Sequence, residues 1–156
     1  MSTELTTGDA APEFELLDQH GNLVNSKDLR GQKTVLFVYP GAMTPGCTKE
    51  ACDFRDNTAH LEALGYRVIG LSKDAVEKQL KFSERDSLNY PLLSDPQLEL
   101  HRKLGAYGPK KLYGKLVEGV IRSTFVIDEN WVIEHALRNV KATGHVARIV
   151  KLLEAA

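Results

Sequence analysis

Apolar residues along the chain alternate between short continuous runs and a helical spacing. The runs at residues 35–39 and 66–72 predict buried strands. Between them, residues 45–64 predict a helix, which Gly65 ends as a residue that readily adopts a left-handed conformation. A strand, a helix and a second strand in this order form a right-handed crossover with parallel strands. The pattern alone therefore predicts an α/β fold.

The segments on either side complete the expected order of elements. Residues 14–17 and 23–24 flank a turn and predict a small hairpin near the N-terminus, followed by a short helical turn at residues 26–31. Residues 106–118 are basic and glycine-containing and predict a loop over the sheet. Further helices are predicted at residues 73–87, 95–104 and 143–153, and strands at residues 120–127 and 131–137. Because no repeat or linker interrupts this order, we expect a single domain over residues 1–156.

Composition and charge exclude several classes of function. The chain has 156 residues, 42% of them hydrophobic, and a formal net charge of −1, which predicts neither a nucleic-acid partner nor an acidic tail. No apolar run approaches the roughly 20 residues that cross a bilayer, so no membrane partner is expected. The first residues show neither the basic nor the apolar region of a secretory signal. We therefore expect a cytoplasmic protein.

The candidate chemistry lies at the predicted start of the helix at residues 45–64. Thr44 and Pro45 are typical of a helix N-terminus, which places Cys47 in the first turn. Free backbone N–H groups and the helix dipole favour thiolate over thiol there. The alternative for Cys47 is a small buried apolar residue. Cys52 is the other cysteine, and a cytoplasmic pair is more often catalytic, redox-sensing or metal-binding than structural.

Cofactor-binding patterns are missing from the sequence. The five histidines are scattered, and a pair of cysteines with no histidine nearby makes a poor zinc site. The chain contains no CxxC, GxGxxG, Walker or haem-binding string. We therefore expect no metal and no organic cofactor, and no thioredoxin-type disulfide reductase activity.

The sequence around Cys47 resembles a known family. Pro40, Thr44 and Cys47 match the PxxxTxxC motif of peroxiredoxins, and the string PGAMTPGCTKEACDFRD is similar to the peroxiredoxin Q or bacterioferritin comigratory protein group. The likeness extends from residues 8–18 through 91–95 to 119–128. It implies a thioredoxin-like fold with an N-terminal β-hairpin addition and a central mixed sheet flanked by helices. It also implies a thiol peroxidase that reduces hydrogen peroxide and organic hydroperoxides.

The resemblance assigns a role to each candidate residue. Cys47 aligns with the cysteine that attacks the peroxide and becomes a sulfenic acid. Thr44 would accept a hydrogen bond from the peroxide, and Pro40 would wall the pocket. Arg122, expected within a strand, would stabilise the thiolate and bind the peroxide, and Glu50 would orient Arg122. Without the resemblance, Thr44 is a helix cap and Pro40 ends a strand. Arg122 is then a solvated strand residue, and Glu50 is an acid in the first turn that suits the helix dipole.

Cys52 is the candidate resolving cysteine, which would form a disulfide with Cys47. Other members of the group place this cysteine in the next helix, which here contains Ser83 and Ser87 and no cysteine. In an intact helix, Cα atoms five residues apart are separated by roughly 8–9 Å, beyond the ~4.4–6.8 Å of most disulfides. The bond therefore requires local unwinding, for which the glycines at 41 and 46 provide backbone freedom. The alternative for Cys52 is a buried structural thiol.

Three hypotheses follow for the whole chain. The leading one is a monomeric or weakly dimeric peroxidase with an internal disulfide that a thioredoxin-type dithiol reduces again. The second is a redox sensor, in which the unwound helix exposes a surface for a partner without repeated turnover. The third is a one-cysteine peroxidase whose sulfenic acid on Cys47 is resolved by an external low-molecular-weight thiol.

Overall fold

The computed structural model describes residues 5–112 and 114–155. Its helical elements are η1 (Ser26–Leu29), α1 (Pro45–Ala63), α2 (Val76–Arg85), α3 (Glu99–Leu104) and α4 (His145–Glu154). Its strands are β1 (Glu15–Leu17), β2 (Leu23–Asn25), β3 (Lys33–Val38), β4 (Tyr66–Ser72), β5 (Leu92–Ser94), β6 (Tyr107–Leu112), β7 (Lys115–Val120), β8 (Ser123–Ile127) and β9 (Ile133–Arg138).

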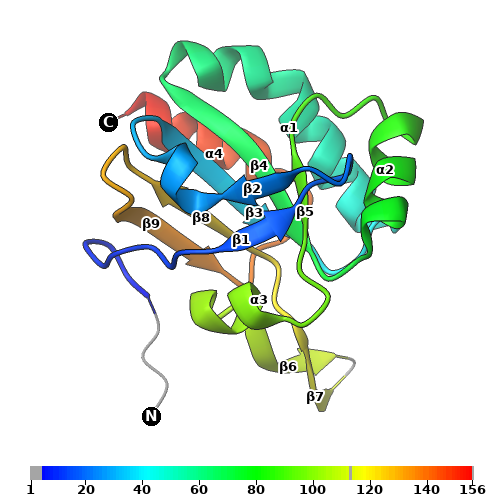
Figure 1. Cartoon of the computed structure of the whole chain (residues 1–156). Helices are drawn as coiled ribbons and strands as arrows, with labels where there is room; N and C mark the ends of the chain where they lie inside the picture. Colours follow the sequence, from blue (N-terminus) through cyan, green and yellow to red (C-terminus); the bar gives the residue numbers. More distant parts are fainter. Residues whose placement is uncertain (1–4, 113, 156) are drawn as a thin grey trace.

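The body of the protein is a mixed sheet of seven strands in the order β2-β1-β5-β4-β3-β8-β9. Strands β3 and β4 are parallel and α1 connects them, as the sequence predicts. The predicted hairpin near the N-terminus is β1–β2, which joins β5 where Leu17 pairs with Ser94 (Figure 1). The expected mixed sheet with an added N-terminal hairpin is thus present.

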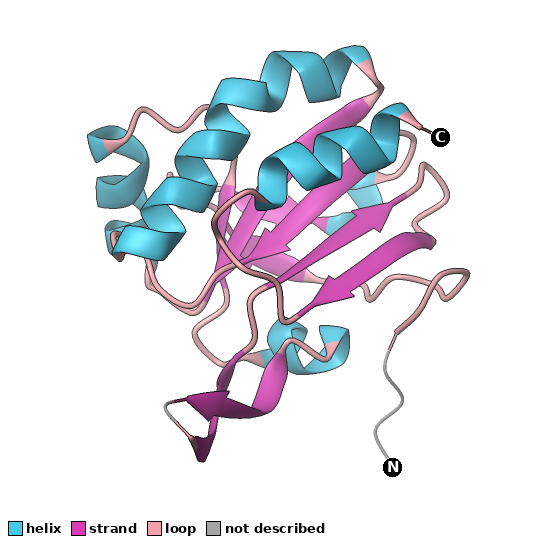
Figure 2. Cartoon of the chain, turned by 180° about the vertical axis from the view of Figure 1, so that it is seen from behind, coloured by secondary structure: helices cyan, strands magenta, loops and turns pink. Residues whose placement is uncertain are grey.

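The alternation of side chains along β3 builds two core clusters, one on each face of the sheet. Val35 and Phe37 belong to the cluster that also holds Cys47, whereas Leu36 and Val38 belong to the other. Helices α1 and α4 cover the first face (Figure 2). The ring of Phe54 on α1 stacks on Phe37 at 4.5 Å, which fixes α1 against the strand.

The predicted loop at residues 106–118 is wrong, because this stretch forms the antiparallel hairpin β6–β7. The hairpin is a separate two-stranded sheet that projects from the body beside α3 (Figure 1). The predicted strand at residues 120–127 is also wrong at its start. Val120 pairs with Tyr107 in the hairpin, while Ser123 pairs with Val38 in the central sheet. Arg122 therefore lies in the connection between two sheets and not within a strand.

Other elements also differ from the prediction, and the bounds of β9 and α4 differ by one or two residues. Strand β5 was not predicted from the sequence, since three residues are too few to show a periodic pattern. Helix α3 begins at Glu99 and not at residue 95, because Leu98 has a left-handed backbone conformation, with a φ of 60°. Helix α2 spans Val76–Arg85 and not residues 73–87, and its buried residues are Gln79, Phe82 and Ser83. Hydrophobic spacing does not predict that the polar residues Gln79 and Ser83 are buried.

Candidate active site

The connection from β3 to α1 delivers Cys47 into the first turn of the helix. Its side chain is buried, with only 1% of its surface exposed. The Nη2 atom of Arg122 lies 3.4 Å from Cys47 Sγ, so a cation faces the sulfur. The guanidinium can therefore donate a hydrogen bond to the Cys47 sulfur.

Thr44 occupies the N-cap position of α1, but its hydroxyl does not cap the helix, contrary to that expectation. The Thr44 hydroxyl donates to the carbonyl of Gly41 at 2.8 Å, and the Thr44 carbonyl accepts from the Thr48 N–H at 2.8 Å. The hydroxyl hydrogen is therefore committed, and the lone pairs of Oγ1 can only accept from a ligand. Thr44 is exposed, which leaves Oγ1 open to a small molecule.

Both the guanidinium and the backbone of Arg122 are fixed by hydrogen bonds. Its Nη1 atom donates to Glu50 Oε1 at 2.6 Å while Nη2 faces Cys47, and its own carbonyl accepts the N–H of Val140 at 3.0 Å. The guanidinium is planar, so fixing Nη1 on Glu50 also fixes the direction of Nη2. The sequence-predicted Cys47, Glu50 and Arg122 are thus brought into direct contact.

Glu50 is fully buried, which sets its electrostatics. Burial raises the pKa of Glu50 to about 7, and the attraction of Arg122 offsets only part of that rise. One reason is that Glu50 Oε2 is buried without a hydrogen bond to the described residues. Burial by itself lowers the pKa of Arg122, but Glu50 and Cys47 outweigh it and leave the pKa raised.

Cys52 lies five residues further along the same intact helix and is half-buried. Both thiols are free, as the helical separation requires. Burial raises the pKa of the Cys52 thiol, with smaller contributions from nearby acids such as Asp86, while Arg55 lowers it. In this conformation Cys52 is a thiol at neutral pH.

Two hydrogen bonds between α1 and the region of α2 were not predicted from the sequence. Arg85 Nη2 donates to Thr48 Oγ1 at 2.7 Å, and the Tyr90 hydroxyl donates to the Ala51 carbonyl at 2.6 Å. Both act on the first turns of α1, where any unwinding would begin. The contacts join residues more than 30 positions apart, so no local pattern signals them.

Pro40 lies in the connection between β3 and α1 and is half-buried.

In the part of the chain that the structure describes, no cluster of three or more His, Cys, Asp or Glu side chains could hold a metal ion. Nor do the described residues contain a helix long and apolar enough to cross a bilayer.

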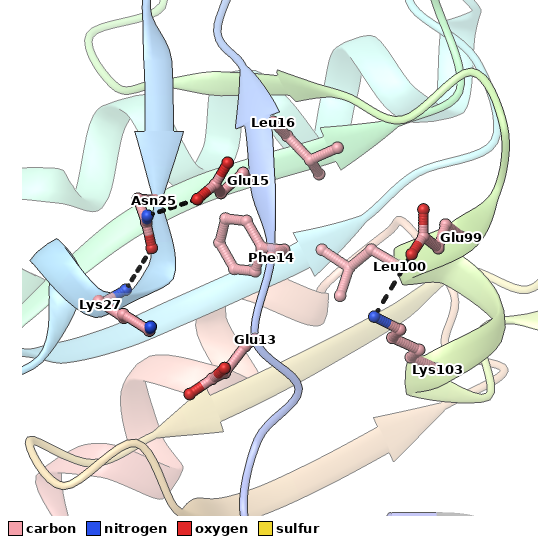
Figure 3. Close-up of a pocket in the computed structure, with 9 residues that line it drawn as sticks. All are labelled: Glu13, Phe14, Glu15, Leu16, Asn25, Lys27, Glu99, Leu100 and Lys103. Atoms are coloured by element: carbon pink, nitrogen blue, oxygen red, sulfur yellow. Dashed lines mark hydrogen bonds and ion pairs between the residues drawn. The ribbon is translucent and has the colours of Figure 1, made fainter.

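A separate cavity of about 340 Å³ lies between residues 13–16 and α3 (Figure 3). Its apolar side consists of Phe14, Leu16 and Leu100, which pack on the core cluster that does not contain Cys47. Its polar rim mixes both charges, with a Lys103–Glu99 ion pair on α3. The cavity is not part of the cysteine site.

Known proteins resemble this chain along most of its length. A model of the AhpC/TSA family matches residues 7–136. A putative peroxiredoxin of Mycobacterium tuberculosis is 53% identical over 148 residues, covering 95% of this chain and 94% of that protein. Peroxiredoxin Bcp of Escherichia coli is 43% identical over 141 residues, covering 90% of each chain.

Solved structures agree with this result. The crystal structure of peroxidoxin BcpB from Mycobacterium tuberculosis has a TM-score of 0.85 and 39% identity, covering 97% of this chain and 98% of that one. The bacterioferritin comigratory protein of Xanthomonas campestris, a protein with alkyl peroxide reduction activity, has a TM-score of 0.85 and 31% identity, covering 91% of this chain and 90% of that one. These neighbours share the thioredoxin-like fold that the resemblance implied. With a family model over most of its length and relatives that match at least 90% of it, the chain belongs to the AhpC/TSA family, in the peroxiredoxin Q and bacterioferritin comigratory protein group of thiol-dependent peroxidases.

Proposed function

We propose that Cys47 is the residue that attacks the peroxide. The thiolate bonds to the terminal oxygen of hydrogen peroxide or an organic hydroperoxide, the O–O bond breaks, and the leaving oxygen departs as water or an alcohol after taking a proton. The product is a Cys47 sulfenic acid. The observation that carries this proposal is the buried Cys47 sulfur facing Arg122 Nη2 at 3.4 Å.

The neighbouring residues supply what the attack needs. Arg122 donates to the oxygen on which negative charge develops, and Glu50 holds Arg122 in that direction through its 2.6 Å bond. Thr44 accepts the hydrogen bond of the hydroperoxide O–H group, which orients the peroxide for in-line attack. Pro40, with no N–H of its own, walls the pocket against water.

Cys52 completes the cycle as the resolving cysteine. The first turns of α1 unwind, the Cys52 thiolate attacks the Cys47 sulfenic acid, and a disulfide forms with loss of water. A thioredoxin-type dithiol then reduces the disulfide. The Cys52 thiol must lose its proton for this step, and unwinding removes the burial that raises its pKa. We assign this cycle to a single domain over residues 1–156, cytoplasmic, and monomeric or weakly dimeric.

The proposal is tested by rapid oxidation of the reduced protein with one equivalent of hydrogen peroxide, followed by intact mass. Wild type is expected to react much faster than a free thiol and to lose two hydrogens without gaining oxygen, which identifies an internal disulfide. Cys52→Ser is expected to react equally fast and to gain one oxygen, which identifies a sulfenic acid. Cys47→Ser is the negative control, because it lacks the thiol that is proposed to react.

Other outcomes have definite meanings. A fast reaction of wild type that ends in a stable sulfenic acid keeps the peroxidase and refutes Cys52 as resolving residue. Oxidation no faster than that of a free thiol refutes the proposed chemistry of Cys47. Turnover with a dithiol reductant separates an enzyme from a sensor, because a sensor need not cycle.

Gly46→Ala is expected to slow the reaction severalfold without loss of stability. An added Cβ would lie 3.3 Å from Arg122 Nη2 and 3.8 Å from Ala142 Cβ, so the nitrogen that faces Cys47 must shift by a few tenths of an ångström. Alanine favours the helix over glycine by about 1 kcal/mol. Stopped-flow rates and urea unfolding measure the two effects, and an unchanged rate would show that this guanidinium position is not critical.

A further inference from the structure

A carboxylate outside the recognised motif holds the connection that carries Thr44. Asp74 lies in the segment between β4 and α2, and its Oδ2 atom accepts the backbone N–H of Ala42 at 2.7 Å. Ala42 is itself buried, so this N–H is paired inside the protein. The bond joins two segments that are 32 positions apart in the sequence.

The Ala42 N–H belongs to the same peptide unit as the carbonyl of Gly41. That carbonyl is the acceptor of the Thr44 hydroxyl at 2.8 Å. A trans peptide is planar, with its N–H and C=O pointing in opposite directions. Fixing the N–H on Asp74 therefore fixes the direction of the carbonyl, and with it the direction of the Thr44 hydroxyl.

The Asp74 carboxylate is fixed in turn by a buried chain of hydrogen bonds. Ser72 Oγ donates to Asp74 Oδ2 at 2.8 Å and accepts from Gln79 Nε2 at 2.9 Å. Gln79 Nε2 also donates to the Leu93 carbonyl at 2.8 Å, and Gln79 Oε1 accepts from the Tyr39 hydroxyl. Both hydrogens of the Gln79 amide and its oxygen are used, which leaves its side chain one orientation.

The chain of bonds starts at Tyr39 and ends at Ala42, so it brackets Pro40 and Gly41. Ser72 and Gln79 are fully buried. A buried polar network in which every member has partners is rigid, because breaking one bond leaves a buried group unpaired. The bracketed segment is therefore the fixed support from which Thr44 extends.

The geometry points to Asp74 as a positioning residue for the peroxide: through the Gly41–Ala42 peptide it aims the acceptor oxygen of Thr44. The inference rests on the proposed function of Thr44 in binding the peroxide. Asp74 does not touch Cys47 or the peroxide itself. Its loss should therefore slow the reaction with peroxide while leaving the nucleophilicity of the Cys47 sulfur unchanged.

The test compares two reactions of Cys47 in a Cys52→Ser background, so that one thiol reports. Asp74→Ala removes the acceptor of the Ala42 N–H. It is expected to slow oxidation by hydrogen peroxide about tenfold to a hundredfold, as small misplacements of reacting groups do. Alkylation by iodoacetamide, which needs no oriented peroxide, is expected to stay within about twofold of the parent.

Three further proteins make the result specific. Asp74→Asn keeps a neutral acceptor and should recover part of the rate, which also covers the case in which Asp74→Ala does not fold. Lys78→Met is the matched control, because Lys78 pairs with the other carboxylate oxygen, Oδ1, at 3.2 Å and is half-exposed. It should leave both rates within about twofold. In a Thr44→Val background, Asp74→Ala should add less than about twofold, since both changes remove the same orientation.

The opposing results are equally clear. Equal losses in the peroxide and iodoacetamide reactions, or additive effects of the Asp74 and Thr44 changes, would mean that Asp74 only maintains the local fold. If the Cys52→Ser parent reacts fast and Asp74→Ala reacts at the same rate with peroxide, the role of Asp74 is refuted while the proposed function stands. A parent no faster than a free thiol would instead refute the proposed function.

Discussion

Arg122→Met is expected to slow the oxidation of Cys47 by hydrogen peroxide about 10²–10³-fold, the usual loss when one preorganised donor to a developing oxyanion is removed. The guanidinium Nη2 lies 3.4 Å from the Cys47 sulfur, so it also adjoins the oxygen that bonds to that sulfur. Methionine retains much of the length and apolar packing of the side chain but has no donor. Stopped-flow oxidation at several peroxide concentrations measures the second-order rate constant.

Arg85→Met is the matched control for this prediction. Arg85 also contacts the first turns of α1, through Thr48 Oγ1 at 2.7 Å, but it is exposed and on the α2 side. Removing it deletes an equal charge and one hydrogen bond to the same helix. Its rate should stay within about twofold of wild type, as expected for a solvent-screened charge. Comparable losses in both variants would show that net positive charge, and not the Arg122 donor, drives the reaction.

Arg122→Lys separates charge from geometry at the same position. Lysine keeps the positive charge but cannot donate to Glu50 and face Cys47 in one plane. We expect a rate between those of wild type and Arg122→Met. A rate equal to wild type would contradict a role for the planar fork held by Glu50.

Much of the fold followed from local pattern. The order β3-α1-β4 was predictable because a run of buried residues, a proline at the helix start and Gly65 at its end are all local signals. Gly65 has a φ of 94°, the conformation that its place after the helix predicted. What the pattern missed is short or depends on pairing, such as β5 and the β6–β7 hairpin.

The same distinction applies to the site. The strings around Cys47 and Arg122 placed the residues that meet, although Arg122 was expected in a strand and lies between two sheets. The contacts that position them were not predictable. Asp74 on Ala42 and Tyr90 on Ala51 are tertiary contacts between polar residues with no periodicity of their own. A sequence motif identifies the reacting groups, whereas the tertiary structure supplies the hydrogen bonds that position them.

At Glu50, burial and ion pairing shift the pKa in opposite directions. The side chain has no exposed surface and its pKa is raised to about 7 from an ordinary value of 4.5. Burial is the larger effect and Arg122 the smaller one, because only one carboxylate oxygen is paired with the guanidinium. The folded protein therefore holds the Glu50 proton more tightly than the unfolded chain does.

Glu50→Gln is accordingly expected to make the protein more resistant to unfolding as pH rises. Below about pH 4.5 both wild-type states are protonated at Glu50, and glutamine resembles that neutral form. Between pH 4.5 and 7 the unfolded chain ionises first, so wild type loses stability that the variant keeps. The full shift corresponds to about 3 kcal/mol above pH 7. Urea unfolding from pH 5 to 8 measures it.

Glu62→Gln on the same helix is the control, because Glu62 is exposed and should show no such pH-dependent difference. A wild type that instead gains stability over Glu50→Gln with rising pH would mean that the bond to Arg122 outweighs burial. The expected result has a mechanistic reason. In the proposed mechanism the cost in stability is offset by function, because the Glu50 carboxylate holds Arg122 Nη1 while Arg122 Nη2 faces the Cys47 sulfur.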